Sequence, residues 1–377
     1  LNEKNVVIII LESMASEYYK FYNKDINEYS GYTPFLDSLL EKSYTSYNCF
    51  TNGRKSIDAI PAVLASIPAV QFNFSLSKYC TNKIAGIGEL LEREGYSTSF
   101  YHGAPNGSMG FESMAKLCGI DNYFGMNEYG KRKDFDGLWG VWDHKFLEFY
   151  AEGLEKMEEP FISSIFTITS HHPYKIPKSH EKMFPNKRNE HPMYSCVQYT
   201  DYALKIFFDK IKKSSWYNNT LFVITADHTN YSRIDKYKSN IGIFRVPIIF
   251  FDPSNPELKG VTNKVMQHID ILPSILYYLG YNKPFIAFGE NIFLKDNTIR
   301  FAINYNNNFQ LISDKYVFIY NPEKKQITNV FLNKEKGIKK NILDKVNKQE
   351  LIIAENRIKG FIQQYNNRMI TNNLIYK

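Results

Sequence analysis

The chain has 377 residues, of which 44% are hydrophobic, so it can bury a large core as one big domain with an appendage or as two domains. Its 46 basic and 39 acidic residues give a formal net charge of +7, and the basic residues are scattered except for a lysine-rich stretch at 334–348. This pattern does not specify a nucleic-acid partner, and it suits an anionic substrate or a membrane surface.

Short runs rich in β-branched and aromatic residues predict buried strands. In chain order these runs are 5–11, 97–102, 161–169, 220–226 and 246–251. Helical patterns lie between and around them, at 35–42, 56–67, 84–94, 140–152, 198–213 and 268–279. Strands that alternate with helices predict an α/β fold, in which a mostly parallel central sheet is sandwiched by helices.

The pattern changes after about residue 295. Three strand candidates follow in succession, at 298–306, 309–321 and 326–332, and a polar helix is predicted near 348–366. We therefore expect a main domain over 1–295 and a small C-terminal α+β subdomain over 296–377, in which an antiparallel sheet and a helix pack on the main domain.

Four cysteines lie far apart without a Cys-x-x-Cys pair, which argues against a structural zinc site and leaves open buried thiols or one or two disulfides. No run reaches the roughly 18 apolar residues that cross a bilayer, and nothing resembles a signal peptide. The chain starts abruptly at Leu1, with a strand-like run from residue 5. We therefore expect a trimmed chain that lacks a targeting or membrane segment.

Polar side chains follow three of the predicted strands. Glu12 follows 5–11, His102 ends 97–102, and Asp227 and His228 follow 220–226. Ligands of open α/β sheets bind beyond the carboxyl ends of the strands, where two carboxylates and an imidazole would suit a divalent cation such as Mn²⁺, Zn²⁺ or Mg²⁺. Taken singly, Glu12 is more typical of a helix cap and His102 of a core histidine, whereas the Asp-His pair is the stronger signal.

The stretch "NGRKSIDAIPA" at 52–62 places Arg54 and Lys55 directly before Ser56, where an apolar helix is predicted to start. A helix start stabilises an anion or phosphoryl group, the two cations add positive charge, and a bound metal can activate a serine hydroxyl as a nucleophile. By itself the stretch favours the alternative that Ser56 only caps the helix, with Asp58 assisting in the first turn.

Five motifs together resemble one family. In this order and at these separations, "NVVIIILES", "GRKSIDA", "FYHG", "TITSHHPY" and "VITADH" resemble the lipoteichoic acid synthase-like branch of the alkaline phosphatase/sulfatase superfamily over about residues 5–280. The resemblance implies that 1–295 is a sulfatase-like catalytic domain. By motif, it implies a single metal, manganese before zinc or magnesium, held by Glu12, Ser56, Asp227 and His228, with Ser56 as the nucleophile.

The same resemblance implies roles for other residues. Lys55 precedes the nucleophile as it commonly does in the family, and His102 and His171 occupy substrate-pocket positions, to which we add Arg54 as a substrate-binding candidate. "WGVWDHKF" at 139–146 resembles a segment that follows the pocket; its tryptophans are expected to pack, and Asp143 is a weaker candidate to cap or line the pocket.

Two departures from family patterns narrow the chemistry. Members that use phosphatidylglycerol carry an aromatic residue and an arginine several residues after the "HG" motif, where this chain has Met109 and Phe111, so that donor is not implied. "SIDAI" lacks the proline and arginine of the formylglycine motif, which disfavours formylglycine sulfatase chemistry.

The function implied by the resemblance is metal-dependent phosphoryl transfer from a phospholipid or lipid-linked phosphodiester, through a covalent phospho-serine, to a glycan or other alcohol. The alternatives are a phosphodiesterase, if water is the acceptor, a phosphoethanolamine transferase on the same site, and a non-catalytic domain that binds anionic polymer. The resemblance also implies an extracytoplasmic domain tethered by an N-terminal membrane region. We expect a monomer with no nucleic-acid partner.

Overall fold

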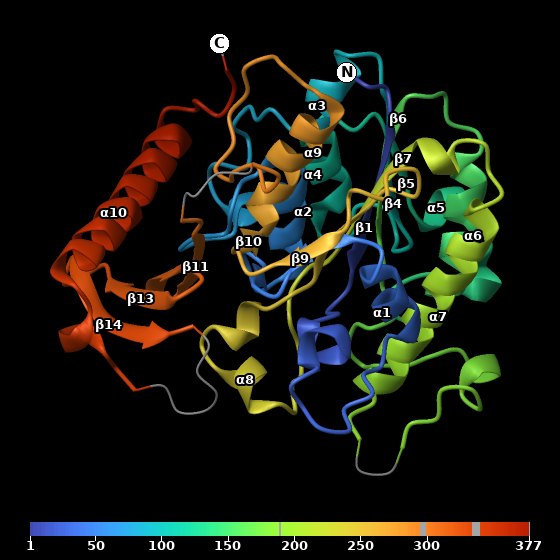
Figure 1. The fold of residues 1–377 in the computed structure, drawn as a ribbon. Helices are drawn as coiled ribbons and strands as arrows, with labels where there is room; N and C mark the ends of the chain where they lie inside the picture. Colours follow the sequence, from blue (N-terminus) through green and yellow to red (C-terminus); the bar gives the residue numbers. More distant parts are fainter. Residues whose placement is uncertain (188–189, 295–298, 334–339, 377) are drawn as a thin grey trace.

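The computed structural model describes residues 1–187, 190–294, 299–333 and 340–376 (Figure 1). Its main sheet has the strand order β5-β4-β6-β1-β7-β8-β2-β9. In chain order the strands are β1 (Asn5–Leu11), β2 (Tyr44–Ser46), β4 (Ser97–His102), β5 (Asn122–Phe124), β6 (Phe161–Phe166), β7 (Thr220–Ala226), β8 (Ile248–Phe251) and β9 (Gly260–Thr262). The five strands from β5 to β7 run parallel, and β8 is antiparallel to β7.

Helices cover both faces of this sheet, so its central strands are buried on both sides. Figure 1 shows one set of helices between the main sheet and the C-terminal strands and another set on the opposite side. The first set is α2 (Ser56–Ala65), α3 (Ile87–Glu92), α4 (Phe111–Leu117) and α9 (Ile271–Leu279); the second is α1 (Pro34–Leu40), α6 (Asp143–Leu154) and α7 (Met193–Ile211). Such two-sided burial explains the continuous apolar runs of β1 and β7.

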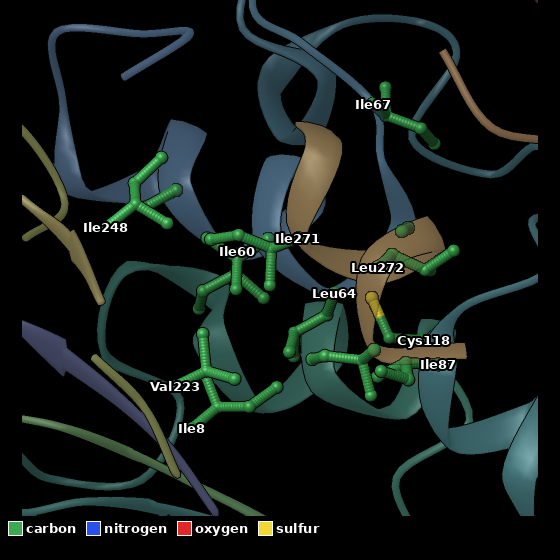
Figure 2. Close-up of a cluster of buried hydrophobic side chains, with 14 of the residues drawn as sticks. Ile8, Ile60, Leu64, Ile67, Ile87, Cys118, Val223, Ile248, Ile271 and Leu272 are labelled. Carbon is green, nitrogen blue, oxygen red and sulfur yellow. The ribbon is translucent and has the colours of Figure 1, made fainter. Parts of the chain in front are cut away.

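Alternate residues of β1 contribute to two separate cores, because successive strand side chains point to opposite faces. Ile8 lies in the core that contains α2 and α9, whereas Val7 and Ile9 lie in the core that contains α6 and α7. Figure 2 shows Ile8 near Ile60 and Leu64 of α2. Both helical layers are therefore anchored on one central strand.

The C-terminal region forms an antiparallel sheet and a long helix. Its strands are β11 (Ala302–Asn306), β12 (Asn308–Ile312), β13 (Tyr316–Asn321) and β14 (Gln326–Leu332), and its helix is α10 (Lys348–Ile370). Tyr365 of α10 donates a hydrogen bond to the Pro68 carbonyl at 3.1 Å, and Arg300 forms a buried 2.8 Å ion pair with Asp270. The fold class predicted from the sequence, including this small sheet and helix, is confirmed.

The remaining elements are short. They are β3 (Cys49–Phe50), β10 (Met266–Gln267), α5 (Met126–Tyr129), α8 (Asp235–Lys238) and several 3₁₀ helices, among them η3 (Phe74–Leu76), η4 (Ser108–Gly110) and η9 (His268–Asp270). All four cysteines are free, so the disulfides that the sequence left open do not form in this structure. Within the described residues, no helix combines the length and apolarity that a membrane crossing requires.

Several predicted bounds were wrong. The predicted strand 161–169 ends at Phe166, the helix 84–94 covers only 87–92, and the helix expected from 198 begins at Met193. The single strand predicted over 309–321 is a hairpin, β12 and β13, because the polar turn between them reverses the chain. The proposed domain boundary at 295/296 and the residues 334–339 of the lysine-rich stretch lie outside the described residues, and the division into two domains stays a prediction.

A buried carboxylate on α7 gives the first testable prediction. Asp201 is 2% exposed and accepts hydrogen bonds from the backbone N–H groups of Phe35 and Leu36 at the start of α1, each at 2.9 Å. Burial raises the pKa of Asp201 from 3.8 to about 7, since these neutral donors do not offset the loss of water. The folded state therefore holds this proton more tightly than the unfolded state.

The stability that Asp201 contributes is thus complete below about pH 4 and is lost as the pH rises through about 7. Between about pH 4 and pH 7 we expect the free energy of unfolding to fall more in the parent than in Asp201→Asn. The extra fall should be roughly 1–4 kcal/mol, because a shift of one pKa unit corresponds to 1.36 kcal/mol. Urea unfolding of both proteins at closely spaced pH values measures this difference. Parallel pH profiles for the two proteins would show that Asp201 does not titrate in this range.

Candidate active site

The pairing of β1 with β7 brings two carboxylates to the same edge of the sheet. Leu11 pairs with Ala226 in the parallel register, so the next residues, Glu12 and Asp227, leave the sheet together. His228 follows at once, and ligand atoms of these three residues all lie within 4.8 Å of one another. The parallel topology therefore joins residues that are more than 200 positions apart in the sequence.

Ser56 enters this cluster from the first residue of α2. Its Oγ donates a hydrogen bond to Glu12 Oε2 at 3.1 Å and lies 3.2 Å from His228 Nε2. Lys55, with extended backbone, occupies the N-cap position of the helix. The alternative that Ser56 only caps α2 is therefore wrong, because its hydroxyl faces the cluster and another residue holds the cap position.

The turn before Ser56 is fixed by Asp58. Its Oδ2 accepts hydrogen bonds from the backbone N–H groups of Arg54 and Lys55 at 3.2 and 3.3 Å, which is the first-turn role that the sequence suggests. A Cβ atom added to Gly53 would lie 2.2 Å from the Asp58 Cβ. Only glycine at position 53 leaves room for the carboxylate that sets the start of α2.

The orientation of His228 leaves one ring nitrogen for a ligand. Nδ1 lies 2.8 Å from the Thr229 carbonyl oxygen, which can only accept, so Nδ1 carries a proton. In the neutral ring the Nε2 lone pair then points to Glu12 and Asp227, at 3.8 and 3.2 Å from their nearest oxygens. A backbone carbonyl that fixes the tautomer in this way is typical of a metal-binding histidine.

Asp227 carries an atom that a cation would satisfy. Its Oδ2 is buried and has no hydrogen-bond partner among the described residues. Burial, and next the charge of Glu12, raise the pKa of the Asp227 carboxyl, so two ionised carboxylates are unfavourable here without positive charge. The donor set of two carboxylates, an imidazole nitrogen and a hydroxyl therefore fits a divalent metal, which Glu12, Asp227, His228 and Ser56 would hold.

One residue that the sequence analysis missed holds both carboxylates. The backbone N–H of Ser13 donates a hydrogen bond to Asp227 Oδ1 at 2.7 Å, and the side-chain Oγ of Ser13 donates one to Glu12 Oε1 at 2.6 Å. Asn230 donates to the same Ser13 hydroxyl at 3.2 Å. The available signal was a serine directly after Glu12, but its double role depends on side-chain geometry.

We expect Ser13→Ala to weaken Mn²⁺ binding about tenfold, because Glu12 loses the donor that orients it and such supporting contacts are typically worth 10–100-fold. Calorimetric titration of the metal-free protein with Mn²⁺ measures the change. Ser43→Ala is the matched control, since it removes the hydroxyl of another buried serine, which donates to the Leu39 carbonyl outside the cluster. Equal affinities in the two variants would remove Ser13 from the site.

A narrow hollow opens beside Ser56. Its volume of about 20 Å³ holds one water-sized group, such as a phosphoryl oxygen. Its wall contains Glu12, Ser56, His102, Ala104, Ser108, Met109, Phe111, Trp139, Phe166, Thr167, Ile168 and His171. This wall is mostly apolar, and Met109 and Phe111 stand where the resemblance implied an aromatic residue and an arginine.

The two predicted pocket histidines differ in environment. His102 is 5% exposed, and burial lowers its pKa to about 3. His171 is half-buried, lies against the Trp139 ring, and has Nδ1 at 2.8 Å from the His172 carbonyl oxygen. His102 is therefore a neutral hydrogen-bonding group at pH 7, whereas His171 is the more accessible of the two to a bound molecule.

The structure places the other candidates less centrally. Lys55 and Arg54 are both exposed. Lys55 lines a second hollow beside the Ser56 pocket, whereas Arg54 lines neither of these two spaces. Asp143 does not line the pocket; it is buried and bound to the Thr169 N–H and the Thr200 hydroxyl. Trp139, expected to pack only, lines the pocket. Spacing along the chain could not distinguish these positions.

Comparison with known proteins places this geometry in a family. The protein-family model described as Sulfatase matches residues 4–281, which is more than half of the chain. The chain belongs to the sulfatase family. It is 26% identical over 346 residues to the lipoteichoic acid synthase-like protein YvgJ of Bacillus subtilis, a match that covers 84% of this chain and 54% of that protein. Lipoteichoic acid synthase 1 of the same organism is 25% identical over 343 residues.

Solved structures share the fold of this sulfatase-family chain. A protein of the alkaline phosphatase superfamily from Vibrio parahaemolyticus superposes with a TM-score of 0.82 at 23% identity, covering 98% of this chain and 88% of that one. The lipoteichoic acid synthase LtaP from Listeria monocytogenes gives a TM-score of 0.82 at 19% identity, covering 98% and 93%.

The resemblance to the lipoteichoic acid synthase-like branch of the alkaline phosphatase/sulfatase superfamily is thus confirmed. The chain spans only about half the length of the curated relatives it matches. The comparisons do not test the roles of the individual site residues, which stay predictions.

Proposed function

We propose that this chain is the catalytic part of a metal-dependent phosphotransferase that acts on a lipid-linked phosphodiester through a phospho-Ser56 intermediate. The observation that carries the proposal is the Ser56 hydroxyl at the start of α2, 3.1 Å from Glu12 and 3.2 Å from His228, in a cluster whose donors fit a divalent cation. The relatives named as lipoteichoic acid synthases support a phosphodiester as the substrate.

In the proposed first half-reaction, each of these residues has a separate role. A bound divalent cation, manganese in our proposal, would lower the pKa of the serine hydroxyl and offset phosphate charge. Ser56 Oγ forms the new bond to phosphorus, and the bond from phosphorus to the lipid alcohol breaks in line with it. Glu12 Oε2, which accepts the hydrogen bond from the Ser56 hydroxyl, is within reach of the departing serine proton. The first N–H groups of α2 and the Lys55 ammonium stabilise the transferred phosphoryl group.

The pocket histidines serve the leaving and accepting oxygens. His171 is placed to give a proton to the departing alcohol, so that this alcohol leaves neutral, and to take one from the acceptor in the second half-reaction. His102, buried and neutral, orients an oxygen by hydrogen bonding. The acceptor is a glycan or another alcohol, and the domain works outside the cytoplasm, tethered to the membrane.

The test is to look for the intermediate. Protein loaded with Mn²⁺ is mixed with a chromogenic phosphodiester, quenched in acid, and digested for mass spectrometry. We expect a phosphate ester on the peptide that contains Ser56 and a burst of chromophore equal to the enzyme concentration. Added glycan should then receive the phosphoryl group in competition with water.

Each outcome has a defined meaning. Chromophore release with the modification on another residue would overturn the assignment of Ser56. Release to water alone at every glycan concentration would make the domain a phosphodiesterase. Binding of anionic polymer without any release would leave it a non-catalytic domain.

A further inference from the structure

A second, larger hollow lies next to the proposed nucleophile. Its volume is about 540 Å³, within the range of small-molecule sites. It is formed by the start of α2, by η3 and by the segment from η4 through α4. Met109 lines both this hollow and the narrow pocket that contains Ser56, so the two spaces share a wall.

The lining of this hollow is mostly apolar, and it includes the polar residues Ser75 and Ser113. Ile57, Leu76, Met114 and Leu117 supply its hydrocarbon surface together with Met109. Leu76 and Met109 are 69% and 40% exposed, so two large apolar side chains of this lining face solvent along one hollow. In the described part of the chain, the one charged residue that lines the hollow is Lys55, directly before Ser56 in the sequence.

We infer that this hollow, here called the chain groove, binds the linear alkyl or acyl chain of the phosphodiester substrate, whose phosphate lies between Lys55 and Ser56. The inference rests on the proposed function only in where it places the phosphate. One cation in a mostly hydrocarbon lining complements an amphiphile with an anionic head, and such a lining offers a sugar or an acidic polymer few partners. Lys55 lines the groove and directly precedes Ser56, and Met109 lies between the groove and the Ser56 pocket, so the phosphate of the ligand belongs on this side of the groove.

A native cysteine makes the chain groove testable without turnover. Cys80 lines the groove and is half-buried, whereas Cys49, Cys118 and Cys196 are buried. The rate at which a thiol reagent modifies Cys80, followed by mass spectrometry, therefore reports occupancy of the groove. The probes are octyl phosphate, kept below its micelle concentration, and methyl phosphate.

We expect octyl phosphate to protect Cys80 at a concentration more than about tenfold below that needed with methyl phosphate, since each buried methylene favours binding by up to about fourfold. Leu76→Asp should raise the protecting concentration of octyl phosphate by roughly tenfold, because it places a charge in the apolar wall. The matched control is Ile206→Asp, at a 42% exposed position on α7, which should behave as the parent.

If octyl phosphate and methyl phosphate protect Cys80 at the same concentration, the proposed role of the chain groove is wrong. It is also wrong if octyl phosphate protects Cys80 equally well in Leu76→Asp and Ile206→Asp. Because labelling requires no catalysis, the two proposals fail separately. Chain-dependent protection without a phosphate ester on Ser56 would remove the proposed function alone. A phosphate ester on Ser56 without chain-dependent protection would remove the groove alone.

Discussion

Ser56→Ala should abolish both the covalent intermediate and turnover of a chromogenic phosphodiester, with kcat reduced by roughly 10⁴-fold or more, as when other enzymes lose their nucleophile. The physical reason is that no other side-chain hydroxyl is placed like that of Ser56, at the start of α2 and within 3.2 Å of both Glu12 and His228, in the described part of the chain. Stopped-flow release of the chromophore, with Mn²⁺ present, measures the burst and the steady state separately.

Two variants make the result specific. Ser56→Thr keeps a hydroxyl at the same position and should retain both the burst and a measurable steady state. Ser38→Ala removes an exposed hydroxyl on α1 that donates to the Phe35 carbonyl, and it should behave as the parent. Turnover of Ser56→Ala at the parent rate would show that another group attacks phosphorus, or that water attacks directly.

Asp227→Asn should remove the stabilisation that Mn²⁺ gives to the folded protein. In the parent, a cation that binds only the native state at a free concentration of 100 times its Kd adds about 2.7 kcal/mol to the free energy of unfolding. The variant loses an anionic ligand whose Oδ2 is buried without a hydrogen-bond partner among the described residues, so its Tm should respond little to the metal. Thermal unfolding with and without Mn²⁺ gives the comparison.

The same variant should be more stable than the parent when both are free of metal. Asparagine removes one of two buried carboxylates whose mutual repulsion contributes to the raised pKa of Asp227. Asp201→Asn is the matched control, because it neutralises another buried carboxylate, away from the cluster, and should keep the full response to Mn²⁺. A Tm of Asp227→Asn that rises with Mn²⁺ as much as the Tm of the parent would place the cation elsewhere.

Much of the fold could be predicted because its long elements carry local signals. The runs 5–11 and 220–226 are mostly apolar, without an alternating polar period, and correspond to β1 and β7 at both ends. Three-residue strands such as β2, β5 and β9 have no such period, and they form only where the edges of the sheet offer partners.

The end of β6 shows how neighbours override composition. β-branched residues continue to Thr169, but β6 stops at Phe166, where its pairing with β1 and β4 also ends. The next residue, Thr167, instead accepts a hydrogen bond from the Glu12 N–H at 3.0 Å. Strand propensity cannot predict this change, because it depends on partners distant in the sequence.

The candidate site divides in the same way. Glu12 and Asp227 could be picked out because each directly follows an apolar strand, with His228 next in the chain, and parallel strands must share a carboxyl edge. Ser13 and the chain groove could not. They depend on which side-chain atoms converge, and a one-dimensional pattern does not encode those distances.

The amino-acid sequence by itself therefore determined the layered α/β class and the residues that leave the sheet at its carboxyl edge, since periodicity and strand ends are local properties of the chain. Only the tertiary structure decided that the Ser56 hydroxyl faces the carboxylates instead of capping α2, that His102 is buried and neutral while His171 is half-buried, and that an apolar hollow adjoins the nucleophile. These features depend on burial and on atoms brought together from distant segments, which packing alone fixes.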